Sequence, residues 1–450
     1  MSLSVVILAA GKGTRMFSDQ PKVLHKLADQ PMLQYVIDIA NELNPKNTSV
    51  IVGYKAKEVK HAFSHEKVNW ILQEKQLGTG DAVKCAIPNL IGQQTLILYG
   101  DVPLIKINEL KKLIKKGEKG LSILTFDKIN PTGYGRIVRG LNDVEAIVEE
   151  KDCSDAQKEI TEVNTGIMVA DTKYLINWLS LISNINSQKE YYLTDIVALA
   201  KKDSIKINTI ESNSEITISG VNSKIELAKM ERAIQLKKSN ALMEQGVTLL
   251  DPSRTDIRGH LDCGTDVVID VGCIFEGKVK IGKNVTIGAY SILKDSKILN
   301  DSIIKPYSHI DNAKVGKNNI IGPYARLRPG TVTNENVHIG NFVEIKNSKI
   351  DSGSKINHLS YVGDSIVGKN VNVGAGTITC NYDGVNKHQT IIEDNVFIGS
   401  NTQLVAPVKI GAGSTIGAGS TITKNTPVNK LSLSRAKQTS IPSWEKPKKS

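Results

Sequence analysis

From about position 251 onward, the chain repeats an aliphatic residue followed by glycine at intervals of six residues. Ile281 and Ile287 lie six apart, each before a glycine, and Ile321 and Ile339 lie eighteen apart. This period is typical of a hexapeptide β-helix, in which each unit forms a short strand and a turn and three units close one coil. Coils stack at about 4.8 Å, aliphatic side chains fill the interior, and Gly or Asn at the corners accommodates positive φ. The period therefore predicts a parallel β-helix, whose hand it leaves open.

The length and composition indicate more than this one domain. A chain of 450 residues exceeds one hydrophobic core and suggests two or three domains. Aromatic residues make up only 5%, which suits a narrow aliphatic prism. The sequence contains no apolar run of membrane-spanning length, and its first residues lack the layout of a signal peptide. We expect a cytoplasmic protein without membrane insertion.

Charge and cysteine content narrow the possible ligands. The formal net charge is +11, and the positive residues are dispersed along the chain, which favours anionic small molecules over nucleic acid. A solvated surface with a disordered basic tail would also explain many of these lysines. The cysteines show no CxxC pair or zinc spacing, so we expect five free thiols: Cys85, Cys153, Cys263, Cys273 and Cys380.

The first half of the chain alternates short β-branched runs with amphipathic stretches. Residues 5–8, 50–52 and 95–99 are typical of buried strands, whereas residues 32–43 carry apolar side chains at helical spacing. Such alternation predicts a parallel sheet covered by helices, whose ligands bind at the carboxyl ends of the strands.

A glycine-rich turn follows the first predicted strand. Gly11 and Gly13 allow the backbone to approach a phosphate chain, and Arg15 and Lys22 add positive charge. A dinucleotide-binding turn is excluded because it requires glycine where Met16 stands. A tight strand-to-helix turn without a ligand remains the alternative.

An acidic residue ends another predicted strand. Tyr99-Gly100-Asp101 directly follows the apolar run 95–98, and a carboxylate placed there could hold a divalent metal against nucleotide phosphates. A turn or helix-capping role is the alternative for a lone aspartate.

A long helix connects the two halves. Apolar residues recur at helical spacing between positions 223 and 245, and Gly246 provides a stop signal. We divide the chain into a nucleotide-binding domain at 1–228, a linker helix at 229–250, and a β-helix domain with a tail at 251–450.

The hexapeptide register is interrupted once. Val373 and Ile398 are twenty-five residues apart where three units occupy eighteen, so seven extra residues leave the coil near positions 380–384. A polar, glycine-containing loop on a rigid scaffold favours a functional role over a decorative insertion. His358 lies nearby, and histidine, with a pKa of about 6.5, suits proton transfer. Glu344, fourteen residues earlier, could hold its other ring nitrogen. A lone histidine is otherwise more often a surface or core residue.

Several motifs together resemble a known family. They are LxxGxGTRM at 8–16, PKVLH at 21–25, QLGTG at 76–80, YGD at 99–101, GYGR at 133–136, IVE at 147–149, NTG at 164–166 and NHLSYVG at 357–363. With the hexapeptide half, the chain resembles the bacterial bifunctional N-acetylglucosamine-1-phosphate uridyltransferases and glucosamine-1-phosphate acetyltransferases. The resemblance implies an α/β fold plus a β fold: a Rossmann-like nucleotidyltransferase domain, a linker helix and a left-handed parallel β-helix.

The resemblance also implies two reactions. Acetyl-CoA would acetylate glucosamine 1-phosphate, and UTP with Mg²⁺ would then convert N-acetylglucosamine 1-phosphate into UDP-N-acetylglucosamine with release of pyrophosphate. The product would supply precursors of peptidoglycan and other cell-envelope polysaccharides.

In the first domain, the resemblance implies that Lys22 and Arg15 face the triphosphate and act in catalysis, and that Asp101 and Asn222 hold Mg²⁺. Here the family more often reads Asn or Asp and then Arg after Asn222, whereas this chain has Ser223 and Lys224, which puts only the neighbouring contacts in doubt. The remaining positions implied to bind the nucleotide and the amino sugar are Leu8, Ala9, Ala10, Gly11, Gln73, Gly78, Thr79, Tyr99, Gly100, Gly135, Glu149 and Asn164.

In the second domain, the resemblance implies that His358 is the base. Residues that would bind glucosamine 1-phosphate are Arg328, Lys346, Tyr361 and Asn372. Residues that would bind acetyl-CoA are Ala375, Asn381, Tyr382, Lys387, Ser400, Ala418 and Arg435. The family assembles as homotrimers with the acetyl site between subunits, and positions 446–450 receive no role.

Two other readings remain open. A nucleotidyltransferase with a purely structural β-helix predicts no catalytic cluster in the second half, against which His358 and Lys346 argue. If the chain were a non-catalytic scaffold, the charged and polar site residues would be expected to be replaced, yet Lys22, Asp101 and Asn222 are present.

Overall fold

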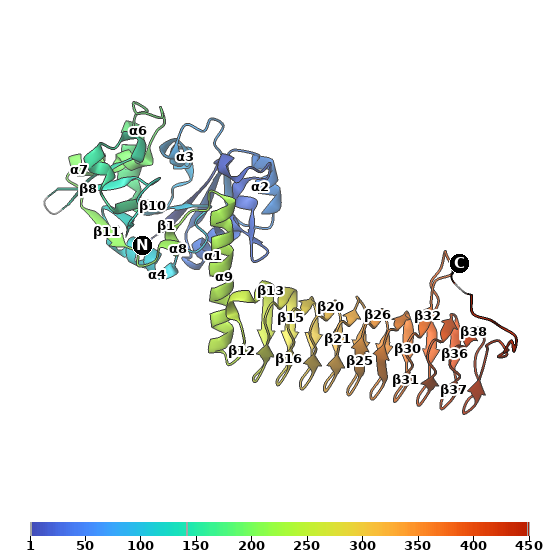
Figure 1. Ribbon diagram of the computed structural model, residues 1–450. Coiled ribbons are helices and arrows are strands. Elements are labelled where there is room, and N and C mark those ends of the chain that lie inside the picture. The colour runs from blue at the N-terminus through green and yellow to red at the C-terminus, as the bar shows by residue number, and fades with distance from the viewer. Residues whose placement is uncertain (1, 141–142, 448, 450) are drawn as a thin grey trace. The chain divides into compact units, whose positions relative to one another are not determined.

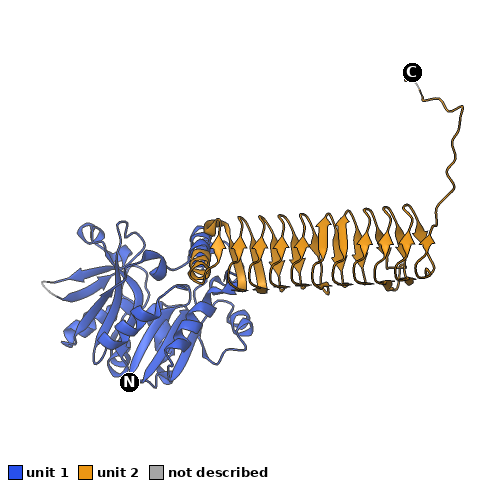
Figure 2. Ribbon diagram, turned by 90° about the horizontal axis from the view of Figure 1, so that it is seen from below, with its two compact units in different colours: residues 1–234 blue, residues 235–450 orange. Residues whose placement is uncertain are grey.

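The computed structural model describes residues 2–140, 143–447 and 449, so Lys448 and Ser450 of the unassigned tail lie outside it. The chain forms two compact units, Met1–Ile234 and Gln235–Ser450 (Figures 1 and 2). The predicted connecting helix is α9 (Lys224–Glu244), which begins in the first unit and ends in the second. In the described ranges, no helix is both long and apolar enough to cross a membrane.

The first unit is built on one sheet with the strand order β11-β7-β10-β6-β1-β4-β5. Parallel pairing joins β1 to β4 and β6, β4 to β5, and β7 to β11, as the sequence pattern predicts. The three predicted strands lie within β1, β4 and β6. The strands of this path are β1 (Leu3–Ala9), β4 (Asn47–Val52), β5 (Asn69–Leu72), β6 (Gln94–Tyr99), β7 (Leu121–Asp127), β10 (Glu162–Asp171) and β11 (Ile207–Glu211).

Alternate side chains of each strand enter two cores, one on either face of the sheet. On β1, Val5 and Ile7 pack with α1, α2 and α4, whereas Val6 packs with α3, α6 and α7. Helices therefore cover both faces of a sheet whose central strands are buried, while the edge strands β5 and β11 are partly exposed. The helices are α1 (Met32–Glu42), α2 (Ala56–Ala62), α3 (Thr79–Cys85), α4 (Ile107–Lys116), α5 (Asp155–Lys158), α6 (Thr172–Leu181), α7 (Ile196–Lys202) and α8 (Glu215–Ile218).

Antiparallel pairing enters this sheet in two places. β10 runs antiparallel to both β6 and β7, and the hairpin β8 (Arg136–Arg139) and β9 (Val144–Val148) attaches to β10. A separate small ribbon pairs β2 (Lys26–Leu27) with β3 (Gln30–Pro31). Apolar runs indicate strands but carry no direction, so the sequence did not predict these antiparallel pairs.

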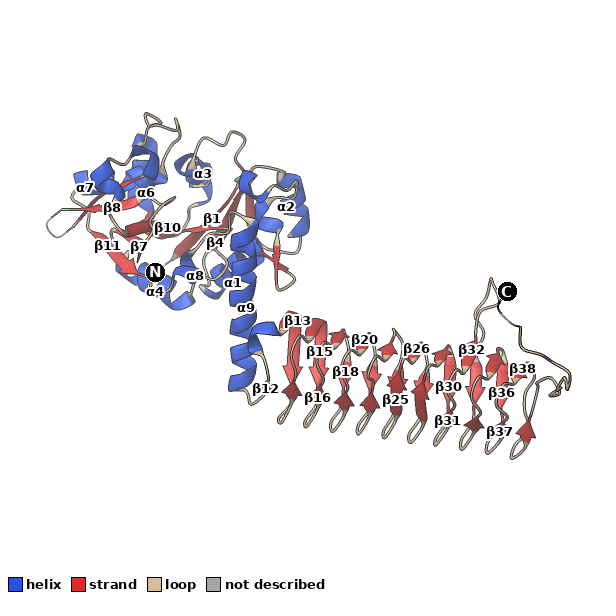
Figure 3. Ribbon diagram, viewed as in Figure 1, coloured by secondary structure: helices blue, strands red, loops and turns tan. Residues whose placement is uncertain are grey.

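The second unit is a parallel β-helix whose strands stack coil upon coil (Figure 3). One sheet holds β12 (Thr248–Leu249), β14 (Val268–Ile269), β16 (Thr286–Ile287), β19 (Ile303–Ile304), β22 (Ile320–Ile321), β25 (His338–Asn341), β28 (Lys355–His358), β31 (Asn372–Val373), β34 (Phe397–Ile398), β37 (Thr415–Ile416) and β39 (Leu431–Ser432).

A second sheet supplies the rest of each coil. It begins with β13 (Asp256–Cys263) and β15 (Ile274–Ile281), which are long, and continues with shorter strands. These are β17 (Ile292–Lys294), β18 (Lys297–Ile298), β20 (His309–Asp311), β21 (Lys314–Val315), β23 (Arg326–Leu327), β24 (Val332–Thr333), β26 (Glu344–Lys346), β27 (Lys349–Ile350), β29 (Tyr361–Gly363), β30 (Ser365–Val367), β32 (Ile378–Cys380), β33 (Thr390–Ile392), β35 (Gln403–Val405), β36 (Val408–Ile410) and β38 (Thr421–Ile422).

The coil register confirms the predicted period and its interruption. Ile321 pairs with Ile339, eighteen residues later, and both side chains are fully buried in the interior. Val373 pairs with Ile398, so the coil that contains the predicted extra loop is twenty-five residues long. Asparagine occupies corners with positive φ, for example Asn318, as this type of turn requires.

Candidate active sites

A pocket of about 330 Å³ opens at the carboxyl ends of β1 and β6. This is the edge at which open α/β sheets bind their ligands. Ten of the predicted nucleotide-site residues line this single pocket: Leu8, Ala9, Ala10, Gly11, Lys22, Gln73, Gly78, Thr79, Tyr99 and Asp101. Val23, Gln76, Ala82 and Glu190 also line it and were not predicted.

Lys22 joins the two predicted metal ligands. Its ammonium contacts Asp101 Oδ2 and lies 3.0 Å from Asn222 Oδ1. The side chains of Lys22 and Asp101 are each only 14% exposed, so this charge pair is screened little by water. Gly13 permits the arrangement, because a Cβ atom there would lie 2.7 Å from Lys22 Cβ.

Polar side chains fix the pocket wall. Gln73 Nε2 donates to Asp81 Oδ2 at 2.8 Å, and Gln76 Nε2 donates to the Ala10 carbonyl at 3.0 Å. Gln76 belongs to the QLGTG motif, so its place in the sequence was a signal that could have identified it. Arg15, in the 3-10 helix η1 (Thr14–Met16), is exposed and lies outside the pocket lining.

The three predicted sugar contacts lie together beside this pocket. The Asn164 amide donates to the Gly135 carbonyl at 2.8 Å, and a Cβ on Gly135 would lie 3.4 Å from Glu149 Oε2. Burial raises the pKa of the Glu149 carboxyl, although a hydrogen bond from Thr194 opposes the shift. Burial also raises the pKa of Tyr99, and the Glu149 and Asp101 carboxylates add to this effect, so Tyr99 stands within the electrostatic reach of both groups.

In the second unit, predicted catalytic and cofactor residues form one column along a corner of the β-helix. Backbone hydrogen bonds join successive coils at this corner, from Gly376 to the Leu359 carbonyl, from Asn401 to the Ala375 carbonyl and from Gly419 to the Ser400 carbonyl. At equivalent coil positions this corner therefore carries Asn341, His358, Ala375, Ser400 and Ala418. The Arg435 guanidinium donates to the Ala418 carbonyl at 2.9 Å, which brings the last predicted cofactor residue to the same corner.

The orientation of His358 differs from the expectation. Its Nδ1 lies 2.9 Å from Asn341 Oδ1, whereas Glu344 forms ion pairs with Arg328 at 2.8 Å and Arg326 at 3.4 Å. The prediction that Glu344 holds the imidazole is therefore wrong in this structure. The physical reason is the register: Glu344 on β26 stacks on Arg326, and Asn341 on β25 stacks on His358 of β28.

A cationic cluster lies on the adjacent face. Lys346 is paired with Asp364 at 3.8 Å, and the neighbouring Lys387 ammonium lowers the pKa of Lys346, as does partial burial, against the opposing effect of Asp364. Asn381 Nδ2 donates to Asp364 Oδ2, which ties the inserted loop to this cluster. The other predicted residues lie on nearby strands, Tyr361 on β29 and Asn372 on β31. Asp364 was not predicted.

The inserted loop is a small hairpin. Tyr382 and Lys387 form an antiparallel bridge, and His388 Nε2 lies 2.7 Å from Asp383 Oδ2. Tyr382 is 59% exposed, so its ring is available to a ligand.

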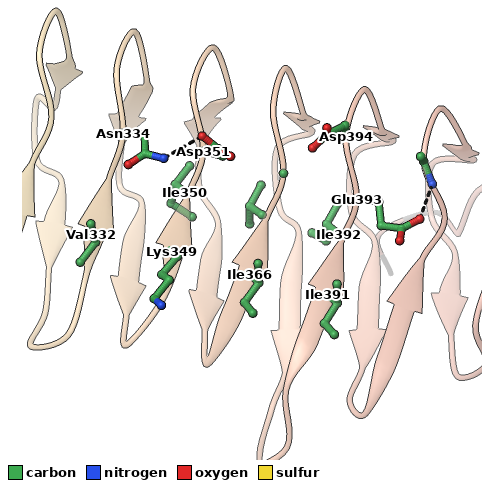
Figure 4. Close-up of a pocket in the computed structure, with 13 residues that line it drawn as sticks. Val332, Asn334, Lys349, Ile350, Asp351, Ile366, Ile391, Ile392, Glu393 and Asp394 are labelled. Carbon is green, nitrogen blue, oxygen red and sulfur yellow. Dashed lines mark hydrogen bonds between the residues drawn. The ribbon is translucent and has the colours of Figure 1, made fainter.

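Another hollow lies elsewhere on the second unit. Its volume is about 540 Å³, and the side chains in Figure 4 line it across β24, β27, β30 and β33. Asn334 donates to Asp351 at its edge, at 2.7 Å. None of its thirteen lining residues belongs to either predicted site, so the volume of a hollow does not by itself mark an active site in this protein.

Three family models match parts of the chain. The MobA-like NTP transferase domain model matches residues 5–147, the GMPPB C-terminal domain model matches 257–339, and the bacterial transferase hexapeptide model matches 389–424. The Bifunctional protein GlmU of Nitrosospira multiformis is 55% identical over 99% of this chain and 98% of its own length. The chain belongs to the bifunctional GlmU family. The GlmU protein of Nitrosomonas europaea is 56% identical over 100% of this chain and 99% of its own.

A solved structure of UDP-glucose pyrophosphorylase complexed with UDP-glucose also aligns with the chain. It covers 53% of this chain and 100% of its own, with 16% identity and a TM-score of 0.44. The GlmU relatives, by contrast, extend over both units.

Proposed function

We propose that this GlmU-family enzyme makes UDP-N-acetylglucosamine at two separate sites, one in residues 1–228 and one in residues 251–450, joined by a linker at 229–250. Family membership carries the bifunctional assignment. The residue assignments are supported by one observation in each unit: ten predicted residues converge on one pocket, and His358 shares a corner with three predicted cofactor residues. Because UTP and acetyl-CoA are intracellular metabolites, the same proposal places the enzyme in the cytoplasm.

In the uridylyl transfer, a phosphate oxygen of N-acetylglucosamine 1-phosphate attacks the α-phosphorus of UTP and the bond to pyrophosphate breaks. Lys22 lies where it can neutralise the charge that develops on the phosphates. Gln73, Gly78 and Thr79 line the wall that would hold the base and ribose, and Glu149 would accept hydrogen bonds from the sugar. Arg15, which is exposed, is proposed to reach the triphosphate only when substrate is bound.

The residues present fit a divalent cation. Asp101 and Asn222 both direct an oxygen atom at one cation, the Lys22 ammonium, and oxygen ligands are those that Mg²⁺ prefers. No group of three or more His, Cys, Asp or Glu residues able to hold a metal occurs in the described part of the chain, so substrate phosphates would complete the coordination. When bound, Mg²⁺ would neutralise phosphate charge.

In the acetyl transfer, the amino group of glucosamine 1-phosphate attacks the thioester carbonyl of acetyl-CoA and the coenzyme A thiolate leaves. A hydrogen bond from His358 Nδ1 to the Asn341 amide oxygen leaves the lone pair of Nε2 free to take the proton of the amine. Arg328 and Lys346 supply positive charge for the sugar phosphate. The exposed ring of Tyr382 and the Arg435 guanidinium would contact the cofactor.

A two-part assay on the purified full chain tests the proposal. Glucosamine 1-phosphate with acetyl-CoA should release free thiol, and N-acetylglucosamine 1-phosphate with UTP and Mg²⁺ should release pyrophosphate. Pyrophosphate without thiol would leave a nucleotidyltransferase with a structural β-helix. Thiol without pyrophosphate would remove the uridylyl assignment.

We further propose that the chain forms homotrimers. The support is a column of exposed aromatic rings, which we name the ring column: Tyr290, Tyr307, Tyr324 and Phe342. Their centroids are 5.4, 4.9 and 5.3 Å apart in succession, and each ring is about half exposed.

The ring column occupies strained positions at the same corner as His358. Each of its residues has a φ between 54° and 61°, which is rare for a bulky side chain, whereas later coils place Gly376 and Gly419 at this corner. A second copy of this chain repeats with the same spacing, so its own coils can match rings that are spaced by one coil. The proposal places the ring column in the contact between subunits.

Replacement of Tyr307 by glutamate should therefore reduce the assembly, because a charge would enter an apolar contact. Light scattering after gel filtration should give three times the chain mass for the unsubstituted protein and a smaller species for Tyr307→Glu. Ile303→Glu is the matched control. Ile303 is 43% exposed and Tyr307 48%, but Ile303 lies on a strand, β19, whereas Tyr307 lies at the corner. Dissociation by Ile303→Glu alone would assign the contact to that face.

A further inference from the structure

Arg136 is among the largest fully buried side chains of the protein, with 2% of the side chain exposed. Its Nη1 donates to the Tyr134 carbonyl, its Nη2 lies 3.9 Å from Glu150 Oε1, and its Nε is buried without a hydrogen-bond partner among the described residues. Burial of an incompletely paired guanidinium is costly, and an apolar side chain would fill the same space at lower cost. This cost indicates that the fold needs the contacts that Arg136 makes.

Glu150 completes a clamp on the turn at residues 133–135. Its Oε2 accepts a hydrogen bond from the Gly133 amide, while its Oε1 faces Arg136. Gly133 has a φ of 90°, a conformation that favours glycine, so this turn depends on outside contacts to stay in one arrangement. Arg136 and Glu150 thus hold backbone groups of two successive residues, the Gly133 amide and the Tyr134 carbonyl.

The clamped turn presents Gly135 to the proposed sugar site. The carbonyl of the next residue, Gly135, accepts a hydrogen bond from the Asn164 amide, and Glu149 lies within reach of Gly135. The two neighbouring glutamates therefore differ in their contacts. Glu149 receives a hydrogen bond from Thr194 beside the sugar site, whereas Glu150 turns to the clamp.

We infer that Arg136 and Glu150 are positioning residues for recognition of the amino sugar phosphate, acting through the turn at 133–135. The inference rests on the proposed uridylyl transfer. Because the clamp contacts the turn and lies outside the lining of the nucleotide pocket, its loss should weaken binding of the sugar phosphate while binding of UTP stays unchanged.

The test measures pyrophosphate release by the full chain while each substrate is varied separately. Arg136→Met and Glu150→Ala should each raise KM for N-acetylglucosamine 1-phosphate about tenfold, and should leave KM for UTP within about twofold. Glu150→Gln keeps an acceptor for the Gly133 amide and should have a smaller effect. The double variant Arg136→Met with Glu150→Ala should be no worse than either single variant, because both act on one turn.

A nearby ion pair provides matched controls. Arg139 on β8 and Glu162 on β10 form a bidentate ion pair, in which Nε and Nη2 of the arginine each donate to a carboxylate oxygen at 2.6 Å. The Arg139 side chain is 40% exposed. Arg139→Met and Glu162→Ala should leave both KM values unchanged. If Arg136→Met fails to fold, the two single variants Arg136→Lys and Glu150→Gln take its place, and the KM values for the two substrates are compared in the same way.

The outcomes separate the inference from the proposed function. Unchanged sugar KM in folded clamp variants, or an equal rise in both KM values, would overturn the positioning role. If the Arg139 and Glu162 control variants raise the sugar KM as much as the clamp variants do, the cause is a general loosening of the hairpin, and the positioning role is overturned as well. If wild-type chain releases pyrophosphate but Glu149→Gln keeps the wild-type sugar KM, the sugar-site assignment is wrong and the inference falls with it.

Discussion

Replacement of His358 by alanine is expected to lower acetyl transfer by about a hundred- to ten-thousand-fold and to leave uridylyl transfer unchanged. The amine substrate must lose a proton as it attacks the thioester, and His358 is the proposed base, which lies at the same corner as the proposed cofactor residues. Thiol release and pyrophosphate release, measured on the same preparation, provide the two rates. Because the sites occupy different units, one rate serves as the control for the other.

Two further variants sharpen this prediction. Asn341→Ala keeps the imidazole but removes the hydrogen-bond partner of its Nδ1, so acetyl transfer should fall by less than in His358→Ala. His260→Ala, an exposed histidine on β13, should change neither rate. Loss of both activities in His358→Ala would contradict independent sites, and a wild-type rate in Asn341→Ala would remove the orienting role.

Much of this architecture follows from the sequence because its signals are periodic. Each interior position of the β-helix recurs with the coil, so the pairing of Ile321 with Ile339 and the long step from Val373 to Ile398 can be read directly. The convergence of the predicted residues on one pocket in the first unit has a related reason. Strand ends in a parallel sheet meet at one edge, so residues such as Gly11 and Asp101 converge although ninety positions separate them.

Side-chain partners were less predictable, because they depend on the coil in which a residue stacks. Glu344 and Asn341 are both close to His358 in sequence, and only the strand register shows that Asn341 contacts the ring. The clamp formed by Arg136 and Glu150 was hidden for the same reason. Strand direction was hidden too, since the side-chain pattern of β8, β9 and β10 does not show that they pair antiparallel.

Replacement of Asp101 by asparagine is expected to lower uridylyl transfer by about a hundredfold or more and to raise the Mg²⁺ concentration that gives half-maximal rate. An amide has no charge with which to hold a divalent cation, and the substitution also leaves the Lys22 ammonium without its carboxylate. Pyrophosphate release over a range of Mg²⁺ concentrations measures both effects, while thiol release should stay at the wild-type rate.

The loss of rate alone does not separate metal binding from the ion pair with Lys22, but the shape of the Mg²⁺ titration does. Lys22→Met removes the ammonium and leaves both oxygen ligands, so it should lower the maximal rate without raising the Mg²⁺ requirement. Asp155→Asn is the matched control, since the Asp155 side chain is fully exposed and should affect neither quantity. A wild-type Mg²⁺ titration in Asp101→Asn would show that the carboxylate serves the lysine rather than the metal, and Asn222 would then lack a partner in the proposed metal site.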